Sequence, residues 1–277
     1  MIDLAQLPAP PIIELLDYEA ILLGMQSELL ALMPSLADAL ALESEPITKL
    51  LEIAAYRELT LRARINDAAK GVMLAYAVGA DLDVLAANFG VSRLADETDT
   101  ALRVRAQMAL EGLTVAGSIG AYIFHSLTAS ARVADVSVES PTPGVVRVNI
   151  QSTDNNGVPD APLIAEVLAY LSAETRRPLC DSVGVFAASI LTYAIEAEIT
   201  CDSGPSSAVV LAAAQAAAAA YVAVHFRLGR EIALSGIYAA LHQPGVSAVN
   251  LISPVASLTP TNRQAARCTA ITLSLEA

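Results

Sequence analysis

Hydrophobic and polar positions follow two different periods along the chain. In residues 44–78 apolar side chains recur at steps of three and four, the spacing of one face of an α-helix. From residue 131 onward apolar and polar residues alternate over several short runs, the spacing of β-strands. The pattern therefore predicts an α+β fold, with an N-terminal long-helix region followed by two tandem small domains of strands plus helix.

The helical half contains two main predicted helices. The first runs from Glu14 to about Met33, where Pro34 stops it. The second covers 44–78, with Ser44 as its N-cap, and is far longer than the roughly 11–12 residues of an average helix. A long apolar stripe needs a helical partner, within the chain or on another chain. We therefore expect a helix-bundle interface made of Ile47, Leu50, Leu51, Ala54, Leu61, Ile65, Ala68 and Val72.

The strand patterns indicate where the domains divide. The turn PTPG joins the alternating runs RVADVSVES and VVRVNIQS, and the last two predicted strands are GVSAVNLIS and CTAITLSL. A polar, turn-rich span at 91–98 is the predicted flexible joint. The expected division is an N-terminal helical region over 1–95, a middle helix-plus-sheet domain over 96–188 and a C-terminal α+β domain over 189–277.

Composition narrows the classes of function. A net charge of −13 argues against nucleic-acid binding, which depends on neutralising phosphates with Lys and Arg. The first residues lack a basic segment followed by an apolar core, so no signal peptide is predicted. The apolar run from Ala208 to Phe226 approaches the length of a membrane span, but it is mostly alanine and contains Gln215. We favour a buried helix there, and a membrane-anchored protein ranks last among the alternatives.

Candidate chemistry is sparse. Motifs for nucleotide, zinc or calcium sites and for a hydrolase nucleophile are missing, so we expect no metal and no cofactor. Wide spacing predicts reduced, buried thiols for Cys180, Cys201 and Cys268, rather than disulfides or a zinc site. A run of carboxylates before a predicted helix is interpreted as a solvated helix start that complements the helix dipole. It comprises Asp96, Glu97 and Asp99.

One pair of residues supports an enzymatic alternative. Tyr238 and His242 are four residues apart on a predicted helix and so share a face. A histidine base normally needs an orienting acid and a nucleophile. Ser235 is close, but the nearest acid, Glu231, is roughly 16 Å away along a continuous helix. A small α+β enzyme using Tyr238 and His242 is therefore the alternative function, and it requires an enclosed pocket around that pair.

Several long stretches resemble the baseplate J-like proteins of contractile phage tails and of phage-tail-like bacteriocins, the R-type tailocins. Near the end these are HFRLG and GREIALSGIYAALHQPGVSAVNLISP. In the helical section the stretch is LESEPITKLLEIAAYRELTLRARINDAAKGVMLAYAVGADLDVLAANFGVSRL, and in the middle it is ALEGLTVAGSIGAYIFHSLTASARVADVSVESPTPGVVRVNI. The resemblance covers nearly the whole chain.

The resemblance implies a structural, non-enzymatic subunit of the baseplate wedge. Two copies would join one copy of a companion baseplate protein I through bundled N-terminal helices. The C-terminal domains would link wedges into a six-fold ring around the central hub and spike, with the sheath initiator nearby. Rearrangement of this ring would control sheath contraction. Such proteins are expected to assemble in the bacterial cytoplasm into a phage tail or tail-like particle that is then released, with no nucleic acid or membrane as partner.

Overall fold

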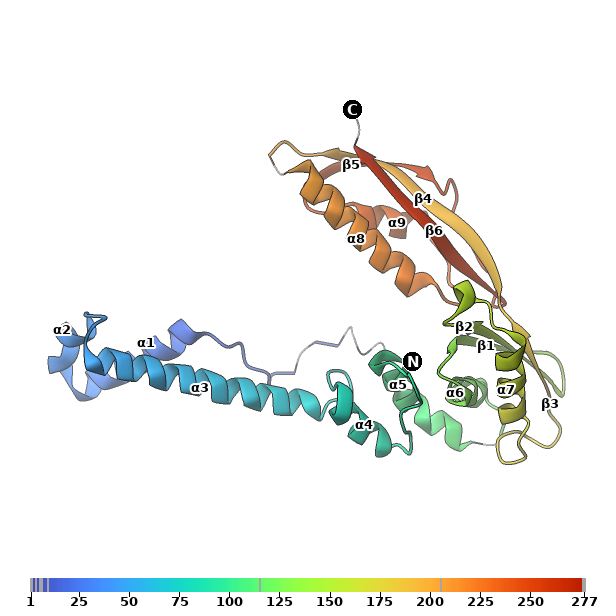
Figure 1. Ribbon diagram of the computed structural model, residues 1–277, viewed down its shortest axis with the longest axis horizontal. Helices are drawn as coiled ribbons and strands as arrows, with labels where there is room; N and C mark the ends of the chain where they lie inside the picture. Colours follow the sequence, from blue (N-terminus) through green and yellow to red (C-terminus); the bar gives the residue numbers. More distant parts are fainter. Residues whose placement is uncertain are drawn as a thin grey trace. The chain divides into compact units, whose positions relative to one another are not determined.

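The fold combines helices with two small sheets. The computed structural model describes residues 2, 4, 7, 8, 10–114, 116–204 and 206–275. By its internal contacts the chain divides into two compact units, Met1–Arg93 and Leu94–Ala277. The described part of the first unit consists of helices and turns, and the second unit contains two three-stranded sheets with helices against them (Figure 1). The expected α+β fold is confirmed.

The first unit is built around one long helix. Its helices are α1 (Tyr18–Leu32), α2 (Ala37–Leu40), α3 (Pro46–Gly71) and α4 (Gly79–Ala87). α1 packs along α3. It begins after Asp17, whose carboxylate accepts a hydrogen bond from the Ala20 N–H at 3.1 Å, and not at Glu14. Pro34 opens a separate 3-10 turn, so the expected end of this helix is close to the observed one.

α3 is shorter than the helix expected over 44–78. Glu45, and not Ser44, occupies the N-cap position, and its side chain makes no capping hydrogen bond. The helix ends at Gly71, where an added Cβ would lie 3.0 Å from a carboxylate oxygen of Asp81 on α4. The glycine therefore allows the next helix to approach closely. Val72 is the C-cap, so the last residue of the predicted stripe lies just beyond the helical turns.

The first sheet of the second unit has the strand order β1-β2-β3. Its elements are α5 (Asp99–Met108), α6 (Ile119–Ala129), β1 (Val133–Thr142), β2 (Val145–Ser152), α7 (Ala161–Leu171) and β3 (Ser182–Ala187). β1 and β2 form the expected antiparallel hairpin, and β3 runs parallel to β2 after the chain crosses over through α7. Val146, Val148 and Ile150 alternate along β2 and enter the core formed with α6 and α7.

The second sheet has the order β5-β4-β6. Its elements are β4 (Ser189–Cys201), α8 (Ser207–His225), α9 (Leu234–Leu241), β5 (Val246–Ser253) and β6 (Gln264–Leu275). β5 is antiparallel to β4 and β6 is parallel to it. Ile195, Ala197 and Ile199 alternate on β4 and pack under α8 and α9, which lie together against one face of the sheet (Figure 1).

Helix α8 is long and apolar enough to pass a test of length and hydropathy for a membrane span. In the structure Val210, Ala214 and Ala218 follow each other at steps of four and are buried against the sheet. Val209 and Val224, on its other sides, are exposed. The expected buried helix is thus buried on one face only, because a single sheet layer covers it.

Two expectations about polar side chains are wrong. Glu97 is buried rather than solvated, and both its carboxylate oxygens accept hydrogen bonds from the Arg105 guanidinium at 2.6 Å. Arg105 lies on α5, eight residues after Glu97, so the two side chains form a buried ion pair. The three cysteines are free, as expected, but Cys180 is exposed and Cys201 and Cys268 are only partly buried.

The two sheets of the second unit keep separate hydrophobic cores. Ala188 alone links β3 to β4. The Leu228 N–H donates to the Asp135 carboxylate at 2.8 Å, and the Gln151 side-chain amide donates to the Phe226 carbonyl at 3.3 Å. Burial raises the pKa of Asp135, against the lowering effect of that backbone hydrogen bond. The sheets are therefore joined largely through polar contacts.

Candidate functional site

Helix α3 has one side covered by the first unit itself. Thr48, Ala55 and Asn66 are its buried residues, and they lie on the side that faces α1 and the segment before it. The Asn66 amide donates to the Glu14 carbonyl at 2.8 Å, and its oxygen accepts from the Glu14 N–H at 3.0 Å. This pair of hydrogen bonds holds the segment before α1 against α3. The small and polar side chains here allow close packing.

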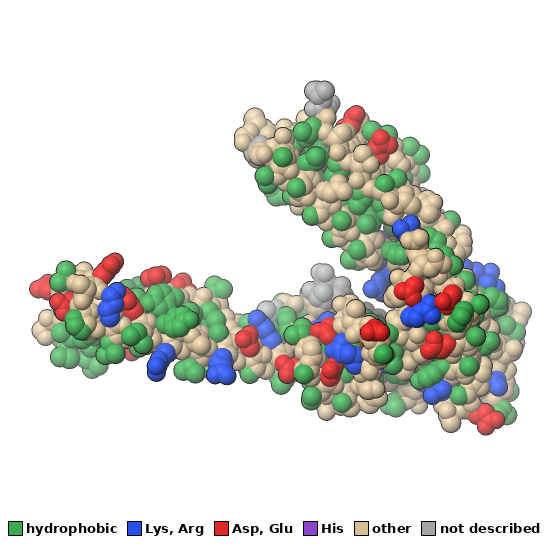
Figure 2. Space-filling model, in the orientation of Figure 1, with side chains coloured by type: hydrophobic (Ala, Val, Ile, Leu, Met, Phe, Trp, Pro, Cys, Tyr) green, Lys and Arg blue, Asp and Glu red, His purple; other side chains and the backbone are tan. Residues whose placement is uncertain are grey.

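The predicted apolar stripe lies on a different side of α3. At about 100° per residue it is centred about 120° around the helix from the covered side. Leu50 is 65% exposed, Leu61 and Ile65 are each 61% exposed, and Val72 is 71% exposed. Figure 2 shows such hydrophobic side chains on the surface of the first unit. Nothing among the described residues covers this stripe.

Most of the predicted interface residues lie on one side of α3 and form a strip that is interrupted near Glu58. Ala68 is exposed, and Ile47 and Ala54 are half-buried on the same side. Leu51 differs, because it is half-buried and its position on the helix turns it toward α1. Seven of the eight predicted positions therefore share one side of the helix, and Leu51 lies between that side and α1; their role as an interface stays a prediction.

Charged side chains border the strip. On the edge nearer α1, the Glu58 carboxylate is 2.6 Å from the Arg62 guanidinium, which is also 3.1 Å from Glu14. The hydrogen bond with Glu58, more than any other effect, raises the pKa of Arg62. Arg57 and Arg64 lie exposed on the opposite edge. The two edges therefore differ: the charged side chains nearer α1 are paired with each other, and the two arginines on the opposite edge are exposed to solvent.

A groove of about 340 Å³ lies between α1 and α3. Ile21 and Met25 contribute apolar surface to it, and Glu28, Glu58 and Arg62 contribute charged groups. It is open, and it lies next to the exposed strip. An additional helix lying on the first unit would find apolar surface both in this groove and along the strip.

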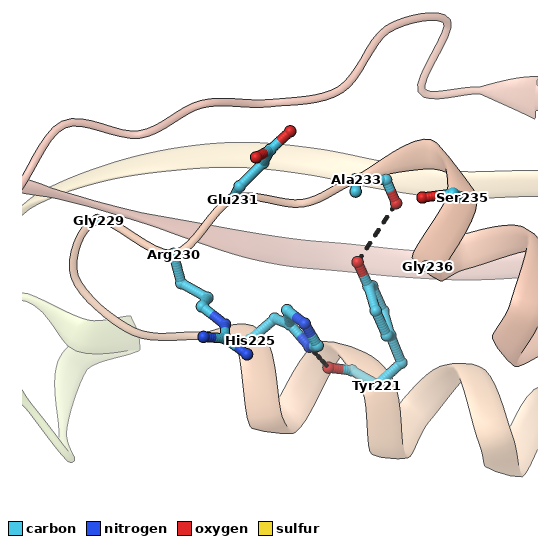
Figure 3. Close-up of a pocket in the computed structure, with 8 residues that line it drawn as sticks. All are labelled: Tyr221, His225, Gly229, Arg230, Glu231, Ala233, Ser235 and Gly236. Atoms are coloured by element: carbon cyan, nitrogen blue, oxygen red, sulfur yellow. Dashed lines mark hydrogen bonds between the residues drawn. The ribbon is translucent and has the colours of Figure 1, made fainter. Parts of the chain in front are cut away.

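A second hollow, of about 400 Å³, lies beside α8 and α9 (Figure 3). The Tyr221 and His225 rings stack with centroids 4.0 Å apart, and the Tyr221 hydroxyl donates to the Ala233 carbonyl at 3.3 Å. The Arg230 side chain extends toward His225, whereas the Glu231 carboxylate points away from both. The hollow is wide open, and its ring groups are used in packing and backbone hydrogen bonds.

The pair behind the enzymatic alternative lies outside this hollow. His242 is the exposed C-cap of α9, and Tyr238 is 40% exposed. Neither residue lines the hollow beside α9, and both are exposed to solvent rather than enclosed. Within the described residues there is also no group of three or more His, Cys, Asp or Glu side chains that could hold a metal ion.

Sequence reasoning missed the residues that decide which side of α3 is free. Asn66 is one of them, and its position on the polar side of the helix gave no sign of its burial, because polar residues there are usually solvated. Its partner is the backbone of Glu14, fifty-two residues away, which no local pattern could identify. Arg57 and Arg64 carry a second signal, because their spacing of seven repeats along the stripe.

Three family models match the chain in succession. The Baseplate J-like N-terminal domain matches residues 43–100, the Baseplate J-like central domain matches 114–187, and the Baseplate J-like protein C-terminal domain matches 193–274. The matches cover well over half of the sequence. The chain belongs to the baseplate J-like family.

The chain is also similar to one curated relative over almost its whole length. The chain is 46% identical to baseplate protein J of Escherichia phage P2 over 289 residues, which cover 97% of this chain and 96% of that protein. The resemblance drawn from the sequence is confirmed. Family membership supports a structural role in a phage baseplate.

Proposed function

We propose that this protein is a structural subunit of the baseplate wedge of a contractile tail, and that it bundles through α3 with a companion baseplate protein I-like subunit. The single observation that supports the bundle is the exposed apolar strip on α3. Its leucine and isoleucine side chains face solvent although the helix is covered on another side. Fully burying one such side chain stabilises an assembly by about 1.5–3 kcal/mol.

The proposed wedge contains two copies of this chain and one of the companion. The N-terminal region over 1–95 forms the bundle, and the domains over 96–188 and 189–277 extend from it. The C-terminal domain links wedges into a six-fold ring around the hub and spike, with the sheath initiator nearby. Movement at the joint over 91–98 allows the ring to rearrange and to control sheath contraction. The particle, a phage tail or a tailocin, assembles in the bacterial cytoplasm before release.

Substitutions on the strip test the bundle directly. The chain is co-expressed with its companion baseplate protein, one of them tagged, and co-purification is measured. Leu50→Asp or Ile65→Asp should abolish co-purification, because each places an unpaired charge inside the interface. Tyr56→Asp is the matched control: Tyr56 is 65% exposed, the same as Leu50, but it lies about 150° away from the strip.

Complex formation by the Leu50 and Ile65 variants at the level of the unsubstituted chain would overturn the bundle through this strip. Loss of the complex with Tyr56→Asp alone would move the interface to another side of α3. Circular dichroism of each purified variant shows whether the helix content of the chain is preserved. Electron microscopy of assembled tails then tests the two-to-one composition and the ring.

A further inference from the structure

We propose that the helix that binds the α3 strip carries acidic side chains about seven residues apart, which pair with Arg57 and Arg64. This inference rests on the proposed bundle and adds the chemistry of the partner. The occupant to which it commits is an amphipathic helix with one acidic edge.

Arg57 and Arg64 lie along the same edge of the strip. Seven residues correspond to about two turns, or roughly 10.5 Å along the helix axis. Leu50 and Leu61 are their apolar neighbours around the helix, and both are exposed. A helix that covers these leucines would bring its own flanking residues next to both guanidinium groups. Flanking positions of this kind select partners in helical bundles.

The chain leaves these two charges without a partner among its described residues. No ion pair joins Arg57 or Arg64 to a described acid, whereas Lys49 pairs with Glu52 at 3.0 Å and Arg62 with Glu58. Side chains three or four positions apart are the ones that pair on a helix. At these spacings Arg57 has no acid, and Arg64 has one, Asp67, to which no ion pair joins it among the described residues. Arg57 therefore lacks a partner because of the helix sequence, in a chain whose net charge is −13.

A second copy of α3 does not supply the missing acids. Glu58, on the other edge of the strip, is already hydrogen bonded to Arg62. Glu52 is paired with Lys49, and both Glu52 and Asp67 lie on sides of the helix away from the strip. In α1 the acids Glu19 and Glu28 are nine residues apart and do not match the arginine spacing. Because these acids of a second copy do not match the two arginines in position and spacing, the proposal assigns the acidic edge to a different chain.

The test is charge reversal in the co-purified complex with the companion baseplate protein. Arg57→Glu with Arg64→Glu should weaken binding by about tenfold at low salt, because attraction becomes repulsion at two positions. Lys49→Glu with Lys70→Glu is the matched control, since it makes the same change in net charge on the far side of α3. The dissociation constant is measured at about 50 mM and about 300 mM salt, where screening separates charge effects from packing effects. Each variant is checked for helix content by circular dichroism.

The outcomes separate this inference from the proposed bundle. Weaker binding by the arginine variant alone, with the difference shrinking at high salt, supports it. Recovery of binding when two acids seven residues apart on the companion helix are changed to Arg identifies the pairing. Loss of binding by Leu50→Asp together with normal binding by the arginine variant would keep the bundle and overturn the acidic edge. Equal weakening by both double variants would also overturn it, because the effect would then be one of net charge. Normal binding by every variant would remove the bundle itself.

Discussion

At the scale of single residues, burial decides what a charged side chain contributes. The Glu97 and Arg105 side chains are almost fully buried and meet through two hydrogen bonds of 2.6 Å. Arg132 also holds two acids, Asp154 at 2.8 Å and Asp160 at 2.7 Å, but all three lie largely in solvent. Water competes for the exposed charges and not for the buried pair.

Removing one partner of the buried pair should therefore be costly. Arg105→Met leaves the Glu97 carboxylate buried without its cation, and we expect the free energy of unfolding to fall by about 3–5 kcal/mol. Urea denaturation of the purified chain measures this. Arg132→Met is the control and should cause a clearly smaller loss. Similar losses for both variants would show that the Glu97 site hydrates when Arg105 is removed.

At the scale of elements, two glycines of the second unit have a left-handed backbone, and one of them lies where the two sheets meet. Gly157 ends the turn after β2 with a φ of +96°, and a Cβ there would lie 2.7 Å from the Phe226 ring and 3.0 Å from the Ile190 side chain. Gly144, in the hairpin between β1 and β2, also has a positive φ, of +79°, but the nearest atom to a Cβ there would be the Cys180 carbonyl oxygen at 3.4 Å. Gly157 is therefore required both by its positive φ and by the lack of space for a Cβ. Gly144 is required by its positive φ alone.

Alanine at these two glycines should separate the constraints. Gly144→Ala should lower the free energy of unfolding by about 1–2 kcal/mol, the cost of a left-handed conformation for a residue with a Cβ. Gly157→Ala adds overpacking against Phe226 and Ile190, which contributes about 1–3 kcal/mol more. Thermal unfolding followed by circular dichroism measures both. A smaller loss at Gly157 than at Gly144 would mean that the β2 turn moves away from Phe226 without cost.

At the scale of the whole molecule, the chain joins bodies that have their own cores. The contact between the two sheets of the second unit includes the carboxylate of Asp135 bound to the Leu228 N–H, with the Arg227 charge nearby. Burial has the largest effect on Asp135 and raises its pKa, while Arg227 and the backbone bonds act in the other direction. A raised pKa means that the protonated form is favoured in the folded state.

This gives the junction a defined dependence on pH. The contribution of Asp135 to stability is fully present below its unfolded pKa of about 3.9 and is lost as pH rises through the higher folded value. Asp135→Asn keeps an oxygen to accept from Leu228 and removes the titration. We expect this variant to be more stable than the unsubstituted chain at neutral pH, with the difference shrinking toward about pH 4. Urea denaturation across that range measures it, and a variant that is less stable at neutral pH would contradict the expected sign.

Local sequence patterns predicted the helices and strands better than they predicted the contacts and burial of individual residues. The alternation of Val146, Val148 and Ile150 identified β2 because every second side chain of a strand shares a face. The length of α3 was overestimated because the pattern alone does not show that α4 approaches Gly71. Glu97 was misjudged for the same reason, since an acid before a helix is usually solvated and its burial depends on Arg105 and the surrounding packing.

The sequence by itself determined the α+β class, the positions of the strands, the family and the apolar stripe of the long helix, because these depend on residues close together in the chain or on similarity to relatives. Only the tertiary structure decided which side of α3 is covered, which side of α8 meets the sheet and which acid is buried. Each of these depends on segments far apart in the sequence that come together on folding, as Asn66 and Glu14 do across fifty-two residues. Periodicity reports that a face is apolar, and the packing of distant segments determines whether that face is used within the chain or stays exposed to solvent.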